Sequence, residues 1–319
     1  MEAAGIIFDD SPHYVDHLAP FCALRNWPLI VCEPSIAALC HAFYPNLKVV
    51  ETSLFDVQSL PPMVVSCSTK AALNDAFPWL NGSYKMAWLP HGQSDKGFKT
   101  PYFEALSKED LLLIYGRRMA DVLHQKNVLI PTETVGNFRL QYFRTHTQFY
   151  EKLLNKTFGK ERFLLYAPTW EDAERNGSFW EAIPYLTKEM PSHVKLAIKP
   201  HPNTLHQFAP QIERCKGLAP DKIFFIEEFP PIYPLLSRVD AYIGDRSSIG
   251  YDFLSYKKPL FFINPHPIDP QSDPSGWLMQ CGIQIRAQQL PRLLQSFNLF
   301  KDSKEHADAR EKLNSYAFS

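Results

Sequence analysis

Several familiar signatures are missing from this 319-residue sequence. It contains no GxxxxGK[ST] loop, no GxGxxG after the first apolar segment and no GxSxG. These absences remove the usual signs of NTP hydrolysis, nicotinamide chemistry and serine hydrolysis. Internal repeats and low-complexity tracts are also absent from the sequence, which excludes repeat architectures.

A strong charge excess, paired cysteines and long apolar runs are lacking too. The formal net charge is -1, which argues against a general nucleic-acid binder. The six cysteines form no CxxC pair and show no zinc spacing, so we interpret them as buried thiols in a reducing compartment. No basic start with a long apolar stretch indicates a secretory signal, and apolar runs such as residues 111–115 are too short to span a bilayer. We therefore expect a cytoplasmic protein, which could touch the inner face of the membrane.

The sequence does contain short apolar runs that alternate with amphipathic stretches from end to end. This alternation predicts an α/β fold with parallel sheets covered on both faces. The expected strands of the first half are residues 5–8, 28–32, 47–51, 63–67, 85–89 and 111–115. Those of the second half are residues 163–167, 194–198, 223–226, 241–244 and 260–263.

The pattern restarts after a helical segment over residues 138–154 and a polar bend over residues 155–162. We therefore expect two doubly wound domains, residues 1–154 and 155–319, that face each other across a cleft. The last helix, about residues 303–319, could pack back on the N-terminal domain.

The segment 242–252, Tyr-Ile-Gly-Asp-Arg-Ser-Ser-Ile-Gly-Tyr-Asp, is the most informative motif. An apolar strand runs into a polar turn, and a helix is expected to begin at Ser247 and Ser248. Unpaired N–H groups and small hydroxyl residues at a helix start favour a phosphate group. Asp252 follows about one turn later and could meet a sugar hydroxyl of the same ligand. The alternative is that Ser247 only caps the helix and Asp252 is solvated.

Two further polar segments follow expected strands. His91, with Gly92, Asp95 and Lys96, comes after residues 85–89, and its imidazole could take a proton from an attacking hydroxyl. Asp95 or another carboxylate could orient the imidazole. The alternative is an ordinary loop histidine beside a solvated Asp-Lys pair. Strand-end residues of a doubly wound sheet share one edge, so we expect these segments to build one site.

Lys199 and His201 are the second of these segments, held between Pro200 and Pro202. A rigid lysine and histidine suit a diphosphate leaving group, because fixed donors stabilise the charge that develops on it. A rigid loop exit is the alternative explanation.

Three weaker candidates also sit at strand ends. Thr169 could donate to a phosphate, although the spacing slightly favours a simple turn with a packing tryptophan. Phe229 could stack on a nucleobase or belong to the core. Asp10 could contact an acceptor, whereas Ser11 and Pro12 are explained by helix capping.

The basic and aromatic segment 139–156 could rest on an anionic membrane surface. An ordinary amphipathic helix between the domains is the alternative, because its charge is modest for membrane binding.

Taken in order, these segments resemble the CDP-glycerol glycerophosphotransferases, the teichoic-acid polymerase and primase group with the GT-B glycosyltransferase fold. The matching stretches are His91-Gly92 with Lys96-Gly97, Val135 to Arg139, Tyr166 to Trp170, Lys199 to Pro202, Asp245 to Ser248 with Tyr251-Asp252, and Pro259 to Phe262. They span residues 88–263 in the family's order.

The resemblance implies a transferase that moves a phosphoglycerol-like or glycosyl group from a nucleotide-activated donor to a hydroxyl acceptor, which could be lipid-linked. His91 would be the base and His201 would contact the diphosphate. The donor site would be completed by Lys199, Asp245, Arg246, Ser247, Ser248, Asp252, Thr169 and Phe229. The acceptor side would comprise Asp10, Gly92, Asp95 and Lys96. The resemblance implies no bound metal, and we expect no cofactor. The net charge predicts no nucleic-acid partner.

The sequence also departs from the family. Arg246 stands where an uncharged residue is common, and residues 264–277 lack the acidic, tyrosine-rich pattern of the polymerases. A UDP- or CMP-sugar transferase, an enzyme similar to UDP-GlcNAc 2-epimerases and a catalytically silent nucleotide- or partner-binding module therefore stay open as alternatives.

Overall fold

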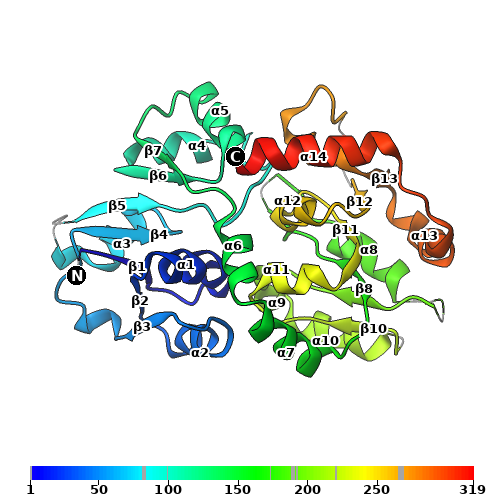
Figure 1. Ribbon diagram of the computed structural model, residues 1–319, viewed down its shortest axis with the longest axis horizontal. Helices are drawn as coiled ribbons and strands as arrows, with labels where there is room; N and C mark the ends of the chain where they lie inside the picture. The colour runs from blue at the N-terminus through cyan, green and yellow to red at the C-terminus, as the bar shows by residue number, and fades with distance from the viewer. Residues whose placement is uncertain are drawn as a thin grey trace.

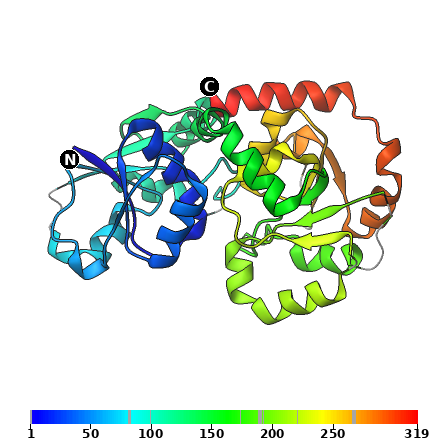
Figure 2. The same cartoon turned by 60° about the horizontal axis from the view of Figure 1, so that its bottom comes forward.

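The chain folds into two α/β lobes that lie side by side, each built on a parallel sheet (Figures 1 and 2). The computed structural model describes residues 2–80, 84–98, 100–172, 174–187, 191, 193–219, 221–264 and 269–319. This arrangement confirms the predicted fold class of two doubly wound parallel-sheet domains.

The first sheet has seven strands in the order β3-β2-β1-β4-β5-β6-β7, with all neighbouring pairs parallel. The strand order reverses between β1 and β4, so a crevice is expected beyond their carboxyl ends. The strands are β1 Ala3–Ile7, β2 Pro28–Val31, β3 Lys48–Glu51, β4 Met63–Ser66, β5 Lys85–Trp88, β6 Leu111–Ile114 and β7 Thr132–Thr134.

The second sheet has six strands in the order β10-β9-β8-β11-β12-β13, again all parallel. Its order reverses between β8 and β11. The strands are β8 Phe163–Tyr166, β9 Leu196–Ile198, β10 Ile223–Phe225, β11 Val239–Gly244, β12 Leu260–Ile263 and β13 Ile283–Ile285.

Helices connect the strands and cover the sheets. Among the residues that the structure describes, seven α-helices precede β8: α1 Pro12–Arg25, α2 Pro34–Phe43, α3 Lys70–Ala76, α4 Tyr102–Ala105, α5 Arg117–Gln125, α6 Phe138–Thr145 and α7 Thr147–Phe158. In the same part of the chain, seven follow it: α8 Phe179–Leu186, α9 Pro202–Gln207, α10 Ala209–Leu218, α11 Ile232–Ser237, α12 Ser248–Phe253, α13 Leu290–Ser296 and α14 Lys304–Phe318.

Each expected strand corresponds to a strand of the structure, but two edge strands were missed. β7 has the sequence Thr-Glu-Thr with every residue exposed, so it carries no apolar pattern. β13 is only three residues long and alternates Ile-Gln-Ile. The expected helix over residues 138–154 is two helices, α6 and α7, which break at His146.

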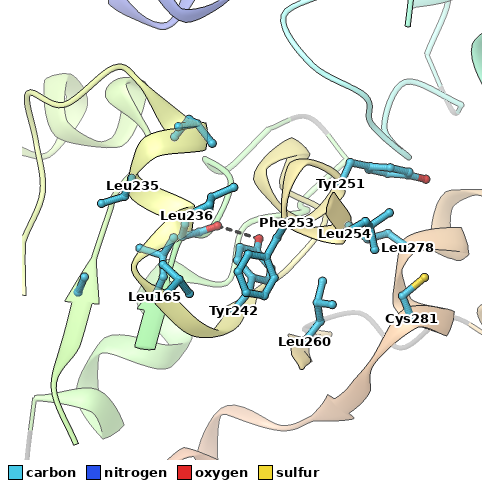
Figure 3. Packing of buried hydrophobic residues seen from close by; sticks show 14 of the residues in the cluster. Leu165, Leu235, Leu236, Tyr242, Tyr251, Phe253, Leu254, Leu260, Leu278 and Cys281 are labelled. Atoms are coloured by element: carbon cyan, nitrogen blue, oxygen red, sulfur yellow. Dashed lines mark hydrogen bonds between the residues drawn. The ribbon is translucent and has the colours of Figure 1, made fainter. Parts of the chain in front are cut away.

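A buried hydrophobic cluster of the second lobe includes side chains of α12 and so fixes the position of that helix. Tyr242, Leu254 and Leu260 belong to one buried cluster, in which Tyr242 Oη donates to the Ala167 carbonyl over 3.0 Å (Figure 3). Tyr251 is also buried, but its hydroxyl points away from the leucine and phenylalanine side chains of this cluster (Figure 3). It reaches the other lobe instead, as described below.

The last helix, α14, lies along the top of the molecule in Figure 1 and ends beside α5 of the first lobe. Gln93 Nε2 donates to the Ala317 carbonyl over 2.7 Å, and the Arg117 N–H donates to the Ser319 carbonyl over 3.0 Å. The helix therefore ties both lobes together. A domain boundary at residue 154 stays a prediction.

Candidate active site

Two adjoining cavities open between the lobes, beyond the carboxyl ends of both sheets. The first cavity measures about 820 Å³ and the second about 470 Å³. Five residues line both: His13, His91, His201, Ser247 and Ser248. The place where the cavities meet therefore combines imidazoles from both lobes with the start of α12.

His91 follows β5 and is brought against the second lobe by the turn at Gly92. Gly92 has φ +120°, and a Cβ at this position would lie 2.7 Å from the Ser248 Cβ. Only glycine allows so close an approach. The His91 ring lies 5.7 Å from that of His13, centroid to centroid. The crevice shared by His91 and the start of α12 is thus present, as the sequence predicted.

His201 comes from the second lobe and caps α9. Its Nδ1 accepts a hydrogen bond from the Asn203 N–H over 3.1 Å. A neutral His201 must therefore carry its proton on Nε2, which makes Nε2–H a donor. The ring lies 5.8 Å from His13 and 6.3 Å from Trp170, so it faces the junction of the two cavities.

The histidines at this junction are neutral at pH 7. Burial lowers the pKa of His13 to about 4, and burial together with neighbouring positive charge lowers the pKa of His91 to about 3 and of His201 to about 2. The His91 side chain is exposed, and it lines both cavities. A neutral imidazole can accept a proton, and a bound anion would raise the lowered pKa of these histidines.

Two lysines supply positive charge next to the histidines. Burial lowers the pKa of Lys199, in the first cavity, to about 8. Lys96, in the second cavity, also has a lowered pKa because of burial, and its Nζ donates to Thr169 Oγ1 over 2.7 Å. Lys199, Lys96 and Thr169 thus lie where the sequence predicted them, around the same junction.

The helix start at residues 247–248 is confirmed. Ser247 occupies the N-cap position of α12, but its side chain makes no capping hydrogen bond. Ser247 is thus the N-cap residue, as the alternative had it, but its hydroxyl does not bond the first N–H groups of the helix. Both serines line the two cavities, facing His91 and His201.

Asp245 and Arg246, which were predicted for the donor site, line neither cavity. Asp245 accepts hydrogen bonds from the Thr169 N–H over 2.8 Å and from the Ser178 N–H over 2.9 Å, and burial raises its pKa to about 7. Arg246 donates to Asn176 Oδ1 over 2.6 Å. Neither residue lines a cavity, because both side chains turn inward to hold the loop after β8. Asp245 therefore positions Thr169, and Arg246 holds Asn176.

Asp95 is also placed differently from the expectation that it orients His91. Its carboxylate pairs with Arg118 and accepts hydrogen bonds from Tyr251 Oη over 2.6 Å and from the Leu278 N–H over 2.8 Å. It lines neither cavity. Burial and these three partners make Asp95 a link between the lobes.

Asp252 and Phe229 line the first cavity, and both side chains also contact other side chains of the protein. Asp252 pairs with Arg139 and accepts from Tyr233 Oη over 3.1 Å. The Phe229 ring is 2% exposed and packs 5.3 Å from that of Phe43.

The remaining acceptor-side residues also reach the cavities. Asp10 lines the first cavity and accepts from Ser35 Oγ over 3.1 Å, whereas Gly92 and Lys96 line the second.

Sequence reasoning missed His13 and His17. His17 Nδ1 lies 2.8 Å from Tyr115 Oη, and His13 Nδ1 has no hydrogen-bond partner within the described part of the chain. The two histidines are four residues apart on α1, a spacing that puts them on one face of a helix. That spacing was the available signal, because helix capping explained the neighbouring Ser11 and Pro12.

The segment proposed to rest on a membrane is partly internal. Arg139, Tyr142 and Tyr150 are buried, and Arg139 Nη1 pairs with Asp16 over 2.9 Å. Among the described residues, no helix is long and apolar enough to cross a bilayer. Within the same residues, no group of three or more His, Cys, Asp or Glu side chains could hold a metal ion.

The second lobe matches a known family. Residues 143–267 match the family model described as CDP-Glycerol:Poly(glycerophosphate) glycerophosphotransferase. These residues include Lys199, His201 and the segment 242–252. No curated protein sequence matches the chain significantly.

Solved structures resemble the whole chain. The wall teichoic acid polymerase TagF with CDPG has a TM-score of 0.64 and 15% identity, over 99% of this chain and 84% of that one. S. aureus MnaA in its UDP co-structure has a TM-score of 0.63 and 14% identity, over 99% and 93%. Anabaena HepE in complex with UDP-glucose has a TM-score of 0.58 and 10% identity, over 99% and 95%. At these identities the likeness establishes the fold.

The family match covers residues 143–267, which include Lys199 and His201, and the structural likeness covers both lobes. The chain is a transferase with the GT-B fold, and its match to the CDP-glycerol glycerophosphotransferase family over residues 143–267 confirms the resemblance found in its motifs.

Proposed function

We propose that the protein transfers a glycerophosphate-like group from a nucleotide-activated donor of the CDP-glycerol type to an acceptor hydroxyl in cell-envelope polymer synthesis. The observation that carries the proposal is the junction of two cavities at His13, His91, His201, Ser247 and Ser248. A transfer reaction needs two ligands that meet at one point, and this junction offers such a point with acid–base groups around it.

The first cavity is the proposed donor site. Its apolar part, with Leu39, Phe43 and Phe229, suits a nucleoside, and Lys199 and His201 suit the diphosphate. The His201 Nε2–H and the hydroxyls of Ser247 and Ser248 would donate to phosphate oxygens. These donors are already in place, so they stabilise developing charge without reorganisation.

The reaction would be an attack of the acceptor oxygen on the phosphorus that carries the glycerol. His91 takes the proton of that hydroxyl, the new O–P bond forms, and the bond from this phosphorus to the CMP oxygen breaks. The leaving CMP keeps the electron pair, and Lys199 and His201 stabilise its charge.

The acceptor could be lipid-linked, which would bring the protein to the inner face of the membrane in the cytoplasm. The exposed residues Arg144, Phe149, Lys152 and Lys156 of α6 and α7 would be the surface nearest to anionic lipids. Free cysteines, five of them buried, suit the reducing cytoplasm.

A donor panel tests the proposal. CDP-glycerol, CDP-ribitol, UDP-sugars and CMP-sugars are compared by thermal shift, because a ligand that binds the folded state raises the Tm by mass action. We expect a shift with CDP-glycerol and release of CMP when acceptor is added. A shift with UDP compounds alone would support the second candidate, a UDP-sugar enzyme, which the likeness to the MnaA and HepE complexes favours.

The variant His91→Ala separates catalysis from binding. We expect CMP release to fall by about 100-fold or more, the usual contribution of a general base, while nucleotide affinity stays within a factor of about two. If the unmodified protein binds a nucleotide but turns over none of the donors, it is a silent binding module and the proposed reaction is wrong.

A further inference from the structure

We propose that His13 donates a hydrogen bond to the phosphoryl group that is transferred, opposite His201 of the other lobe. The inference rests on the proposed function and adds a residue of the first lobe to the contacts of the reacting group. His13 stands at the start of α1 and lines both cavities at their junction. Neither the proton transfer to His91 nor the binding of the diphosphate by Lys199 and His201 requires it.

His13 lies beside both histidines that take part in the proposed reaction. Its ring is 5.7 Å from that of His91 and 5.8 Å from that of His201, centroid to centroid. In that reaction, the phosphorus under attack lies between the acceptor oxygen at His91 and the diphosphate bridge at His201. His13 is therefore next to the place where this phosphorus must lie.

The surroundings of the His13 ring decide which nitrogen carries the proton. Nδ1 is enclosed by protein and has no hydrogen-bond partner among the described residues. Buried N–H groups without an acceptor are rarer in proteins than acceptors without a donor. Burial lowers the pKa of His13 to about 4, so at pH 7 the ring is neutral and its single proton belongs on Nε2.

This protonation state also decides what His13 does. Nε2 is the ring nitrogen left to face the cavities, because Nδ1 is enclosed. An Nε2–H group is a donor and does not take a proton from the attacking hydroxyl, so His13 is not a second base beside His91. The Tyr14 ring packs against it with the centroids 4.3 Å apart and limits its rotation.

His13 and His201 thus present the same kind of donor from opposite lobes. His201 carries its proton on Nε2 because its Nδ1 accepts from the Asn203 N–H over 3.1 Å. During phosphoryl transfer, the charge on the non-bridging oxygens is redistributed, and donors that are fixed beforehand stabilise it. His13 keeps its proton throughout, since it donates a hydrogen bond and transfers nothing.

Steady-state kinetics of CMP release from CDP-glycerol test the inference, with glycerol and an alkyl glycoside as probe acceptors. In His13→Phe, which fills the same space without a donor, we expect kcat to fall about 10- to 100-fold, the usual cost of one hydrogen bond to a charged group. CMP lacks the transferred phosphorus, so its affinity should stay within a factor of about two. The matched control is His124→Phe on α5, which lines neither cavity and should keep the kcat of the unmodified protein.

A sulfur-substituted donor shows which atoms His13 contacts. Sulfur replaces one non-bridging oxygen on the glycerol-bearing phosphorus of CDP-glycerol, and it accepts hydrogen bonds less well than oxygen. For at least one of the two diastereomers, we expect sulfur to slow the unmodified protein by a larger factor than it slows His13→Phe, because the variant has already lost the contact. A residue that only supports the fold would leave the two factors equal.

The conservative variant is His13→Gln. Its amide nitrogen lies as many bonds from Cα as the imidazole Nε2 does, so it should recover part of the kcat that His13→Phe loses. If the two variants are equally slow, or if sulfur slows the unmodified protein and His13→Phe by the same factor, the inference is wrong.

The unmodified protein separates this inference from the proposed function. If it releases CMP from CDP-glycerol and His13→Phe does so at the same rate, the contact does not exist and the proposed function stands. If the unmodified protein releases no CMP, both fail.

Discussion

At the residue scale, the burial of histidine side chains makes the stability of the protein depend on pH. Burial and the nearby Arg139 hold the pKa of His17 well below its usual value. Below about pH 6.5 the unfolded chain takes up a proton that the folded state refuses, so this residue lowers stability as pH falls. Above that pH both states are neutral and the effect vanishes.

We therefore predict that His17→Asn flattens the pH dependence of unfolding. Between pH 6.5 and 5, the slope of the unfolding free energy should fall by up to about 1.4 kcal/mol per pH unit relative to the unmodified protein. Comparing slopes cancels the opposite contribution of Asp16, whose pKa burial raises to about 6. Urea titrations at several pH values measure this, and parallel slopes for the two proteins would contradict the account.

Gly92 provides the second prediction at this scale. Gly92→Ala would place a Cβ 2.7 Å from the Ser248 Cβ at a backbone φ of +120°. We expect a lower Tm and a loss of nucleotide affinity, because the lobes must separate at the site.

The matched control is Gly217→Ala, where a Cβ meets nothing within 4 Å. It should be neutral or stabilise by about 0.5–1 kcal/mol, since alanine is the better helix residue. Equal Tm values for the two variants would refute the close contact between the lobes.

At the scale of elements, the position of the end of α14 can be tested with a single substitution at Gly116. A Cβ on Gly116 would lie 2.7 Å from the Ala317 carbonyl oxygen and 2.8 Å from the Ser319 nitrogen. Because these are backbone atoms, Gly116→Ala should displace the end of α14 from α5.

Hydrogen exchange should then quicken over residues 312–319, while the strands of both sheets keep their protection. Unchanged exchange in that segment would show that the end of α14 tolerates the added methyl group.

Most elements could be predicted from the sequence, because buried parallel strands are read as apolar runs. β7 could not, since Thr-Glu-Thr is exposed at every residue and has no apolar pattern. The break between α6 and α7 was hidden as well, because its apolar residues fall on one face on both sides of His146.

The site was predictable where a strand end carries an unusual polar residue. His91, Lys199, His201 and Ser248 were found in this way, and they converge. Asp95 and Asp245 illustrate the limit of the method. Their neighbours in sequence point to the site, but their partners come from distant segments, such as Leu278 for Asp95 and Thr169 for Asp245.

At the scale of the whole molecule, two buried ionic clusters join the lobes. Asp95 with Arg118 meets Tyr251, and Arg139 lies between Asp16 on α1 and Asp252 on α12. Removing one partner of such a cluster leaves an uncompensated buried charge.

We predict that Arg139→Met lowers the unfolding free energy by about 3–5 kcal/mol, because it leaves two buried carboxylates facing each other. The control is Arg162→Met, whose pair with Asp240 is nearly half exposed and should contribute under about 1 kcal/mol. Calorimetry measures both, and equal losses would mean that the buried cluster does not hold the lobes.

The central claim is that a nucleotide diphosphate binds between the lobes, at Lys199, His201 and Ser248, facing His91. A crystal structure of the protein with CDP-glycerol tests it most directly. We expect the diphosphate oxygens within hydrogen-bond distance of His201 Nε2 and Ser248 Oγ, and the glycerol-bearing phosphorus turned toward His91. A nucleotide bound outside this crevice, or with its diphosphate turned away from His201 and Ser248, would contradict the account.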